Sequence, residues 1–182
     1  MRALLCAVGL LALASQADAA DSDAMAKTTG GFYAAYSTFH PSDGIPDARG
    51  RAKYAPYVSD RLNGLFVEAK AAEDKFASAN KDTPPLVEGD LFTSNFEGAS
   101  SYKVGACAGD AKAGHCAVQL TYDPGKTGNP KDKPINWTDT AYLVNTPAGW
   151  KVDDIGFGGN WDFGNKGKMS DTLRMVITTA GN

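Results

Sequence analysis

The segment that decides the fold lies near the C-terminal end of this 182-residue chain and reads Ala148-Gly149-Trp150-Lys151-Val152-Asp153-Asp154-Ile155-Gly156-Phe157-Gly158. Trp150 and Val152 alternate with charged residues, which is the period-two pattern of a half-buried strand. The apolar positions then change parity at Ile155 and Phe157. A β-bulge would return these two side chains to the Trp150 face; alternatively, both faces are partly covered and Asp154 points into the same space as Trp150.

Three more strand-like segments precede this one. Ser101–Ala108, His115–Asp123 and Thr138–Thr146 carry Val, Tyr, Thr and Ile in alternation, and segments rich in Gly, Pro and Asn separate them. Pro147-Ala148-Gly149 is typical of a tight hairpin turn. Together with Gly149–Phe157, these segments predict an antiparallel meander.

Helical patterns come before the strands. Apolar residues recur at three- and four-residue intervals over Ala24–Phe39, and a second helix is expected from an N-cap at Ser59 to about Asn80. A last amphipathic stretch, with Ser170 as its N-cap, fits either a helix or a strand. Helices followed by a meander predict an α+β domain, in which N-terminal helices pack on one face of a curved antiparallel sheet.

The first 19 residues are expected to be a secretory signal peptide, and residues 20–182 a single domain. Arg2 supplies the positive charge, Ala3–Ala14 the apolar run and Ala17-Asp18-Ala19 an A-x-A cleavage site. The apolar run is shorter than the roughly 20 residues that span a bilayer, so no membrane anchor is expected after cleavage. The sequence therefore predicts a periplasmic or secreted protein.

Two cysteines follow the expected cleavage site, Cys107 and Cys116. Exported compartments are oxidising, and the turn-rich residues between these cysteines lie between two strand-like segments. A redox pair usually has C-x-x-C spacing, and a metal site needs more ligands than two thiols and the nearby His115. We therefore expect a structural disulfide that closes a hairpin.

Charge and motifs exclude several classes of function. Lys and Arg number 18 against 21 Asp and Glu, so nucleic acid is not an expected partner. The sequence has no G-x-S-x-G motif of a serine hydrolase. His40 precedes a proline at an expected helix end and His115 flanks a cysteine in a turn, so neither is expected to be catalytic. Glu88-Gly89-Asp90, or Asp43 with Asp47, could offer oxygen ligands to calcium, but neither has the spacing of a calcium loop. No metal and no cofactor is expected.

Aromatic residues are concentrated in the C-terminal third, where Trp137, Trp150 and Trp161 lie. They either form the apolar core of the sheet or line a concave pocket with a few polar groups. For the pocket, the candidate ligand-binding residues are Asp154, Trp150, Tyr142 and Gln119, the last two chosen from strand position alone. Asp154 is also the one weak candidate for a catalytic residue.

The final hairpin resembles the closing hairpin of proteins similar to nuclear transport factor 2. Over about residues 31–175 the chain also resembles an exported bacterial family known as domain of unknown function 3828. The resemblance is carried by Phe32-Tyr33 with Tyr36, Glu88-Gly89-Asp90-Leu91-Phe92, Trp137-Thr138-Asp139 and Trp150-Lys151-Val152-Asp153-Asp154-Ile155. It implies a cone-shaped fold with packed helices and export, but no activity. The glycine- and aromatic-rich run Gly156–Gly164 departs from the pattern.

These observations favour an exported, non-enzymatic binding module that takes a small ligand or a protein partner in the concavity of the sheet. One alternative is an enzyme that uses Asp154 as a general base. That role requires an open cavity and a second polar group about 3–6 Å away. Another alternative is an immunity or inhibitor protein that blocks an exported effector with the loop Gly156–Gly164.

Overall fold

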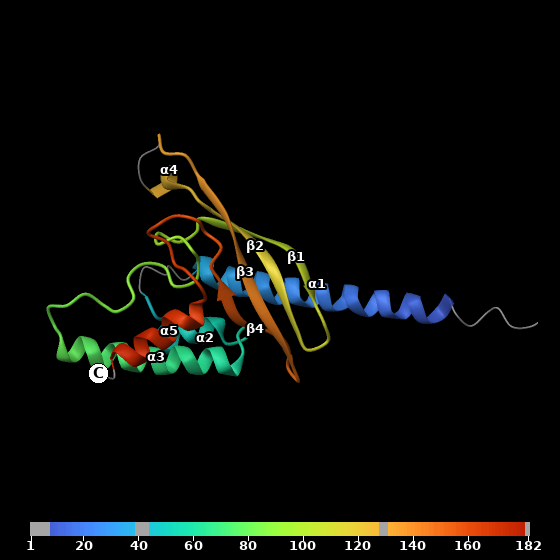
Figure 1. Cartoon of the computed structure of the whole chain (residues 1–182), viewed down its shortest axis with the longest axis horizontal. Coiled ribbons are helices and arrows are strands. Elements are labelled where there is room, and N and C mark those ends of the chain that lie inside the picture. Colours follow the sequence, from blue (N-terminus) through green and yellow to red (C-terminus); the bar gives the residue numbers. More distant parts are fainter. Residues whose placement is uncertain (1–7, 39–43, 128–130, 181–182) are drawn as a thin grey trace, which may run out of the picture.

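The computed structural model describes residues 8–38, 44–127 and 131–180. Their elements confirm the α+β class (Figure 1). In chain order they are α1 (Val8–Thr38), α2 (Ala48–Tyr54), α3 (Asp60–Ala79), β1 (Ser101–Gly109), β2 (Ala113–Tyr122), α4 (Pro124–Thr127), β3 (Ile135–Thr146), β4 (Gly149–Gly156) and α5 (Met169–Thr179). Within the described ranges, no helix is both long enough and apolar enough to cross a membrane.

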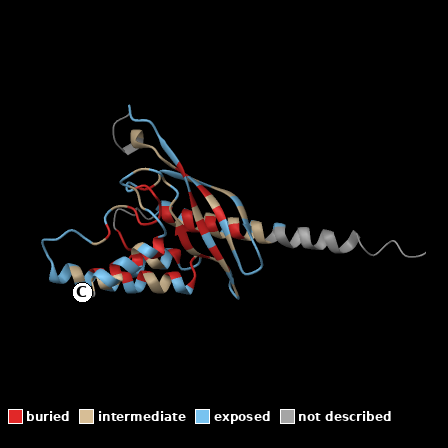
Figure 2. Ribbon diagram, in the orientation of Figure 1, coloured by how far each residue is buried: buried red, intermediate tan, exposed pale blue. Residues whose placement is uncertain are grey.

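The four strands form one antiparallel sheet in the order β1-β2-β3-β4, which is the predicted meander. Its inner face packs on α1, and the buried residues concentrate where α1 crosses the strands and where α3 meets α5 (Figure 2). An aromatic cluster fills this interior, and the rings of Tyr54 and Phe92 stack with centroids 4.9 Å apart. Phe32, Tyr33 and Phe66 are also fully buried there. The inner face is therefore occupied by the protein's own side chains.

The bulge alternative for β4 is confirmed. Tyr142 and Leu143 are consecutive on β3, yet they pair with Asp154 and Val152, so Asp153 is an extra residue on β4. Beyond the bulge Ile155 is fully buried, as the return to the apolar face requires. Asp154 is buried as well, at 5% exposure.

Two short segments cover the outer edge of β4, one on each side of the bulge. Val58 pairs with Val152 in parallel, and Lys168 pairs with Gly156 antiparallel. Because α3 and α5 begin directly after these two segments, both helices start beside the bulge. This edge pairing also protects backbone groups that an open edge strand would expose.

The helices differ from the sequence prediction in several places. Helix α1 begins at Val8 rather than Ala24, and the expected stop at His40-Pro41 lies outside the described residues. Helix α1 continues through Gly31, where a Cβ atom would lie 2.1 Å from the ring of Tyr57, so this contact leaves no room for a side chain. The prediction missed α2, which starts where Asp47 accepts a hydrogen bond from the Gly50 amide at 2.8 Å.

The predicted ends of α3 are confirmed, and the last helix begins at a different cap. Ser59 is the N-cap of α3, accepting a hydrogen bond from the Leu62 amide at 3.0 Å, and Asn80 is its C-cap. The ambiguous last segment is a helix, α5. Its N-cap is Lys168 and not Ser170, because the Ser170 hydroxyl is directed to β4 instead.

The expected disulfide is formed. Cys107 and Cys116 lie opposite each other on β1 and β2, with Cα atoms 4.1 Å apart. The Cys116 side chain is fully buried. The bond therefore joins two neighbouring strands at a point where a register shift interrupts their pairing.

Candidate functional site

A depression of about 440 Å³ lies where α3, the bulge of β4 and the start of α5 meet. We name it the α5 cleft. The side chains that matter for its chemistry are Arg61, Tyr142, Asp154, Lys168, Ser170 and Arg174. Its volume falls within the range of small-molecule sites in proteins.

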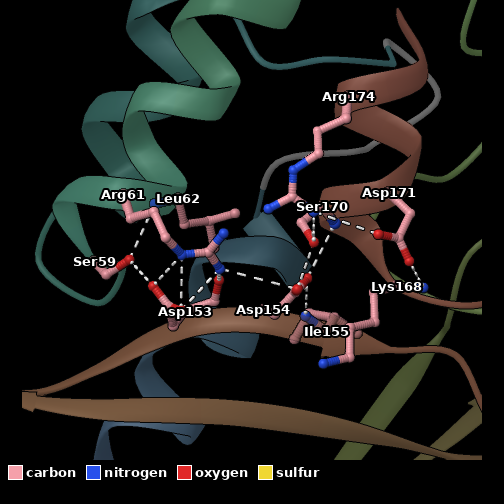
Figure 3. Close-up of polar contacts among 10 residues, drawn as sticks. All are labelled: Ser59, Arg61, Leu62, Asp153, Asp154, Ile155, Lys168, Ser170, Asp171 and Arg174. Carbon is pink, nitrogen blue, oxygen red and sulfur yellow. Dashed lines mark hydrogen bonds and ion pairs between the residues drawn. The ribbon is translucent and has the colours of Figure 1, made fainter.

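Asp154 holds the start of α5 against β4. Its Oδ1 atom accepts hydrogen bonds from the amides of Ile155 and Ser170, each at 3.0 Å, and its Oδ2 atom accepts one from the Ser170 hydroxyl at 2.6 Å (Figure 3). A carboxylate is the preferred acceptor for the amides that a helix leaves unpaired in its first turn. The carboxylate of Asp154 is thus committed to the backbone and to a neighbouring hydroxyl.

Asp153, the bulged residue, is matched to Arg61. The Arg61 Nε atom lies 3.0 Å and 2.9 Å from the two carboxylate oxygens of Asp153, and Nη2 also donates to the Asp153 carbonyl. Figure 3 shows Arg61 reaching from α3 to β4. The hydrogen bond to Asp153 is the largest cause of a raised Arg61 pKa. Arg61 Nη2 stands 3.9 Å from Asp154 Oδ2, so the same cation faces both carboxylates.

The start of α5 supplies the remaining charges of the cleft. The Lys168 ammonium stands 4.3 Å from the centroid of the Tyr142 ring. Arg174 Nη1 donates to the Ser170 hydroxyl at 3.2 Å and to Asp171 at 3.4 Å. Asp171 also accepts a hydrogen bond from the Lys168 amide at 3.2 Å. Both cationic side chains lie on the accessible side of the cleft.

The four sequence-predicted binding residues do not share one pocket. Asp154 and Tyr142 pair across β4 and β3, and both line the α5 cleft. Trp150 is 6% exposed, and its Nε1 atom donates to Asp21 of α1 at 3.1 Å. Gln119 lies exposed on the outer face of the sheet, where it lines a separate depression of about 440 Å³.

Sequence reasoning missed the structural role of Asp139, which is fully buried. It accepts hydrogen bonds from the amides of Ser94 (2.8 Å) and Gly158 (2.9 Å), from Trp137 Nε1 (3.0 Å) and from the Ser94 hydroxyl. Asn165 adds bonds from its side chain to two carbonyls of the loop that contains Ser94. These contacts fix both ends of the loop Gly156–Gly164. The sequence did contain a signal: Asp139 lies two residues after Trp137, at the start of the third predicted strand, so its carboxylate points to the same apolar face as the indole.

Asp90 is a third buried carboxylate. It accepts hydrogen bonds from the amides of Phe92 (2.6 Å) and Thr93 (2.8 Å) and from the Tyr36 hydroxyl (2.7 Å). Burial raises the pKa of Asp90 to about 6, against the lowering effect of these hydrogen bonds. Burial, with the charge of Asp90, also raises the pKa of Tyr36.

Two of the carboxylates considered for calcium, Asp90 and Asp47, have other partners. The carboxylate of Asp90 is used within its own loop, and Asp47 caps α2, where the Gly50 amide lowers its pKa. Asp43 lies outside the described residues. In the part of the chain that the structure describes, no three His, Cys, Asp or Glu side chains are grouped so that they could hold a metal ion.

Asp90 makes stability depend on pH. Its pKa is raised in the folded state, so the folded protein binds more protons than the unfolded chain between about pH 4 and 6, and stability falls as pH rises through this window. We expect the free energy of unfolding to decrease by about 2 kcal/mol from pH 4.5 to pH 7, measured by urea denaturation. Asp90→Asn should flatten this slope, whereas Asp60→Asn at the exposed start of α3 should keep it. An unchanged slope in Asp90→Asn would contradict the assignment.

Comparison of the chain with protein-family models, with curated proteins and with solved structures finds no match. The function therefore has to be argued from the geometry of the described residues. In the α5 cleft that geometry combines accessible cations and an aromatic ring with a floor of two carboxylates, Asp153 and Asp154, that protein donors hold in place.

Proposed function

We propose that this chain is an exported, non-enzymatic binding module that holds a small ligand in the α5 cleft. The observation that carries the proposal is the division of charge in the cleft. The carboxylates of Asp153 and Asp154 are engaged by protein donors, whereas Lys168 and Arg174 present their charged groups to the open side. A site with fixed polar groups beneath and accessible ones above suits binding without rearrangement.

The enzyme alternative, with Asp154 as general base, has weaker support. A general base must reach the proton that it abstracts, and it needs a free lone pair directed to the substrate. Asp154 accepts three hydrogen bonds from Ile155 and Ser170, and its side chain is 8% exposed. These contacts favour an anchoring role for the carboxylate.

Export is proposed with cleavage after Ala19. The disulfide between Cys107 and Cys116 supports it, because such bonds persist in oxidising compartments. The expected boundary also suits the fold, since Asp21 and Ser22 already bond to Trp150 and Cys107. Mass spectrometry of the exported protein should give a chain that begins at Ala20 and lacks free thiols.

The family and the finer fold belong to the same proposal. Helices α1–α3 precede an antiparallel meander, and a β-bulge bends the last strand. This arrangement supports a fold similar to nuclear transport factor 2, in a member of the exported family called domain of unknown function 3828. In this chain an aromatic cluster occupies the inner face, so we place the ligand at the outer α5 cleft.

A second candidate function, blocking an exported effector, is favoured by one observation. Phe163 is 89% exposed, although its loop Gly156–Gly164 is fixed at both ends. The amides of Gly158 and Gly159 donate to the side chains of Asp139 and Ser94, and the amide of Asn165, just after the loop, donates to the Ser94 carbonyl. An apolar side chain held in solvent on a well-anchored loop suits a protein contact.

The proposed ligand site can be tested by ligand-observed NMR with a chemically mixed fragment set. Val144 lines the α5 cleft, and Val144→Trp should fill it and abolish the hits. Thr138→Trp is the matched control. Thr138 lies exposed on the same strand, β3, but it lines the separate depression that contains Gln119. Hits that survive in Val144→Trp, or no hits at all, would overturn the proposal. Conversion of a hit to product over time would favour the enzyme.

A further inference from the structure

Resting on the proposed function, we infer that the α5 cleft selects a small organic monocarboxylate with an apolar body. Three features of the cleft lead to this ligand class: its balance of charge, the donors of Arg174 and Lys168, and an apolar wall on β2 and β3.

The lining of the cleft carries three cations and three carboxylates, and they are divided between its floor and its open side. Asp153 is neutralised by Arg61, whose guanidinium also faces Asp154. Asp154 is further satisfied by two amides and the Ser170 hydroxyl. At the open side Lys168 and Arg174 stand beside Asp171, whereas the side chain of Asp154 lies on the floor and is only 8% exposed. A monoanion that contacts Lys168 and Arg174 has two cations as partners, whereas a dianion would meet stronger repulsion from Asp154 and Asp171.

The donors that remain have the geometry for a carboxylate. Both hydrogen bonds that join Arg174 to other described residues come from Nη1, so in this part of the chain its Nε and Nη2 atoms point to no protein acceptor. A guanidinium offers parallel donors that match the two oxygens of a carboxylate. The Lys168 ammonium is held by the Tyr142 ring and pairs with no carboxylate among the described residues. Because Lys168 lines the same cleft as Arg174, it can add a second charge contact to the ligand.

The wall beside these donors is apolar. Ala113 and Val144 pair across β2 and β3, so their side chains share the outer face of the sheet with Tyr142. Tyr142 is 37% exposed and Val144 is half-buried. A ring or short alkyl chain placed on this wall would shield apolar surface from water while its carboxylate meets the cations.

The test compares four probes by isothermal titration on the full chain: phenylacetate, the neutral phenylacetamide, the cationic phenethylammonium and inorganic phosphate. Phenylacetate should bind at least tenfold more tightly than each of the other three. Arg174→Gln and Lys168→Gln should each weaken phenylacetate binding about tenfold. Lys166→Gln should not weaken it, because Lys166 bonds to the Gly159 carbonyl outside the cleft. Thermal unfolding of every variant checks that the fold is kept.

The outcomes separate this inference from the proposed function. Equal binding of phenylacetate and phenylacetamide, or tighter binding of phosphate or phenethylammonium, would overturn the carboxylate assignment and leave a binding module in the α5 cleft. Phenylacetate binding that both glutamine variants retain would overturn it as well. Failure of all four probes, while fragments bind in a manner sensitive to Val144→Trp, overturns only the ligand class. Failure of probes and fragments together overturns the proposed function.

Discussion

Replacing Asp139 by alanine should lower the free energy of unfolding by about 4 kcal/mol, the largest effect that we expect from a single polar substitution. The change leaves the amides of Ser94 and Gly158, the indole N–H of Trp137 and the Ser94 hydroxyl without their acceptor. A buried donor that loses its partner costs about 1–3 kcal/mol, and the separate losses are not fully additive. Urea denaturation monitored by tryptophan fluorescence measures the effect.

The same substitution should release the loop Gly156–Gly164, because Asp139 bonds directly to one end of it. Hydrogen exchange of the loop amides should then rise while α3 keeps its protection. Asp162→Ala is the control, since Asp162 is exposed on this loop. It should change stability by less than about 0.5 kcal/mol. Equal stability of Asp139→Ala and Asp162→Ala would show that the network around Asp139 contributes nothing.

The sheet could be predicted from the sequence because each strand carries its own signal. Side chains alternate between the two faces, and turn residues mark the ends, so the edges of the predicted strands lie within three residues of the observed ones. The break in parity after Val152 had a bulge as one of its two explanations, and the register of β3 and β4 shows that bulge. Helix α2 gave no such signal, because Ala48–Tyr54 is short, has a basic residue at every second position and depends on its cap at Asp47.

The site was less accessible to sequence reasoning because its parts meet only through long-range contacts. Arg61 and Ser170 reach β4 because Val58 and Lys168 pair along its outer edge, and nothing local in the sequence specifies that pairing. The partner of Asp139, Ser94, is 45 residues away. Gln119 and Tyr142 were both chosen by strand position, and the two separate because they lie over different depressions of the same outer face. Strand parity thus assigns a face, but not a neighbour.

The second large effect is expected for Asp154→Ala, which should destabilise the fold by about 3 kcal/mol. It removes the acceptor of the Ile155 amide, the Ser170 amide and the Ser170 hydroxyl, and leaves Arg61 with Asp153 alone. The loss of stability should be greatest in α5, because its first turn loses its anchor on β4. Hydrogen exchange of the amides in that turn should therefore rise more than exchange in the sheet.

Two comparisons show whether this loss is structural. Asp171→Ala removes an exposed carboxylate from the same helical turn, which accepts hydrogen bonds from the Lys168 amide and from Arg174, and should cost only about 0.5–1 kcal/mol. Asp154→Asn keeps one oxygen for the amides and should recover about half of the stability lost in Asp154→Ala. If Asp154 only anchors the helix, Asp154→Asn should bind phenylacetate with an affinity close to that of the wild type, because Lys168 and Arg174 of the cleft remain in place. If Asp154→Asn were as stable as the wild type but inactive in a turnover assay, Asp154 would be a catalytic base and the anchoring role would be wrong.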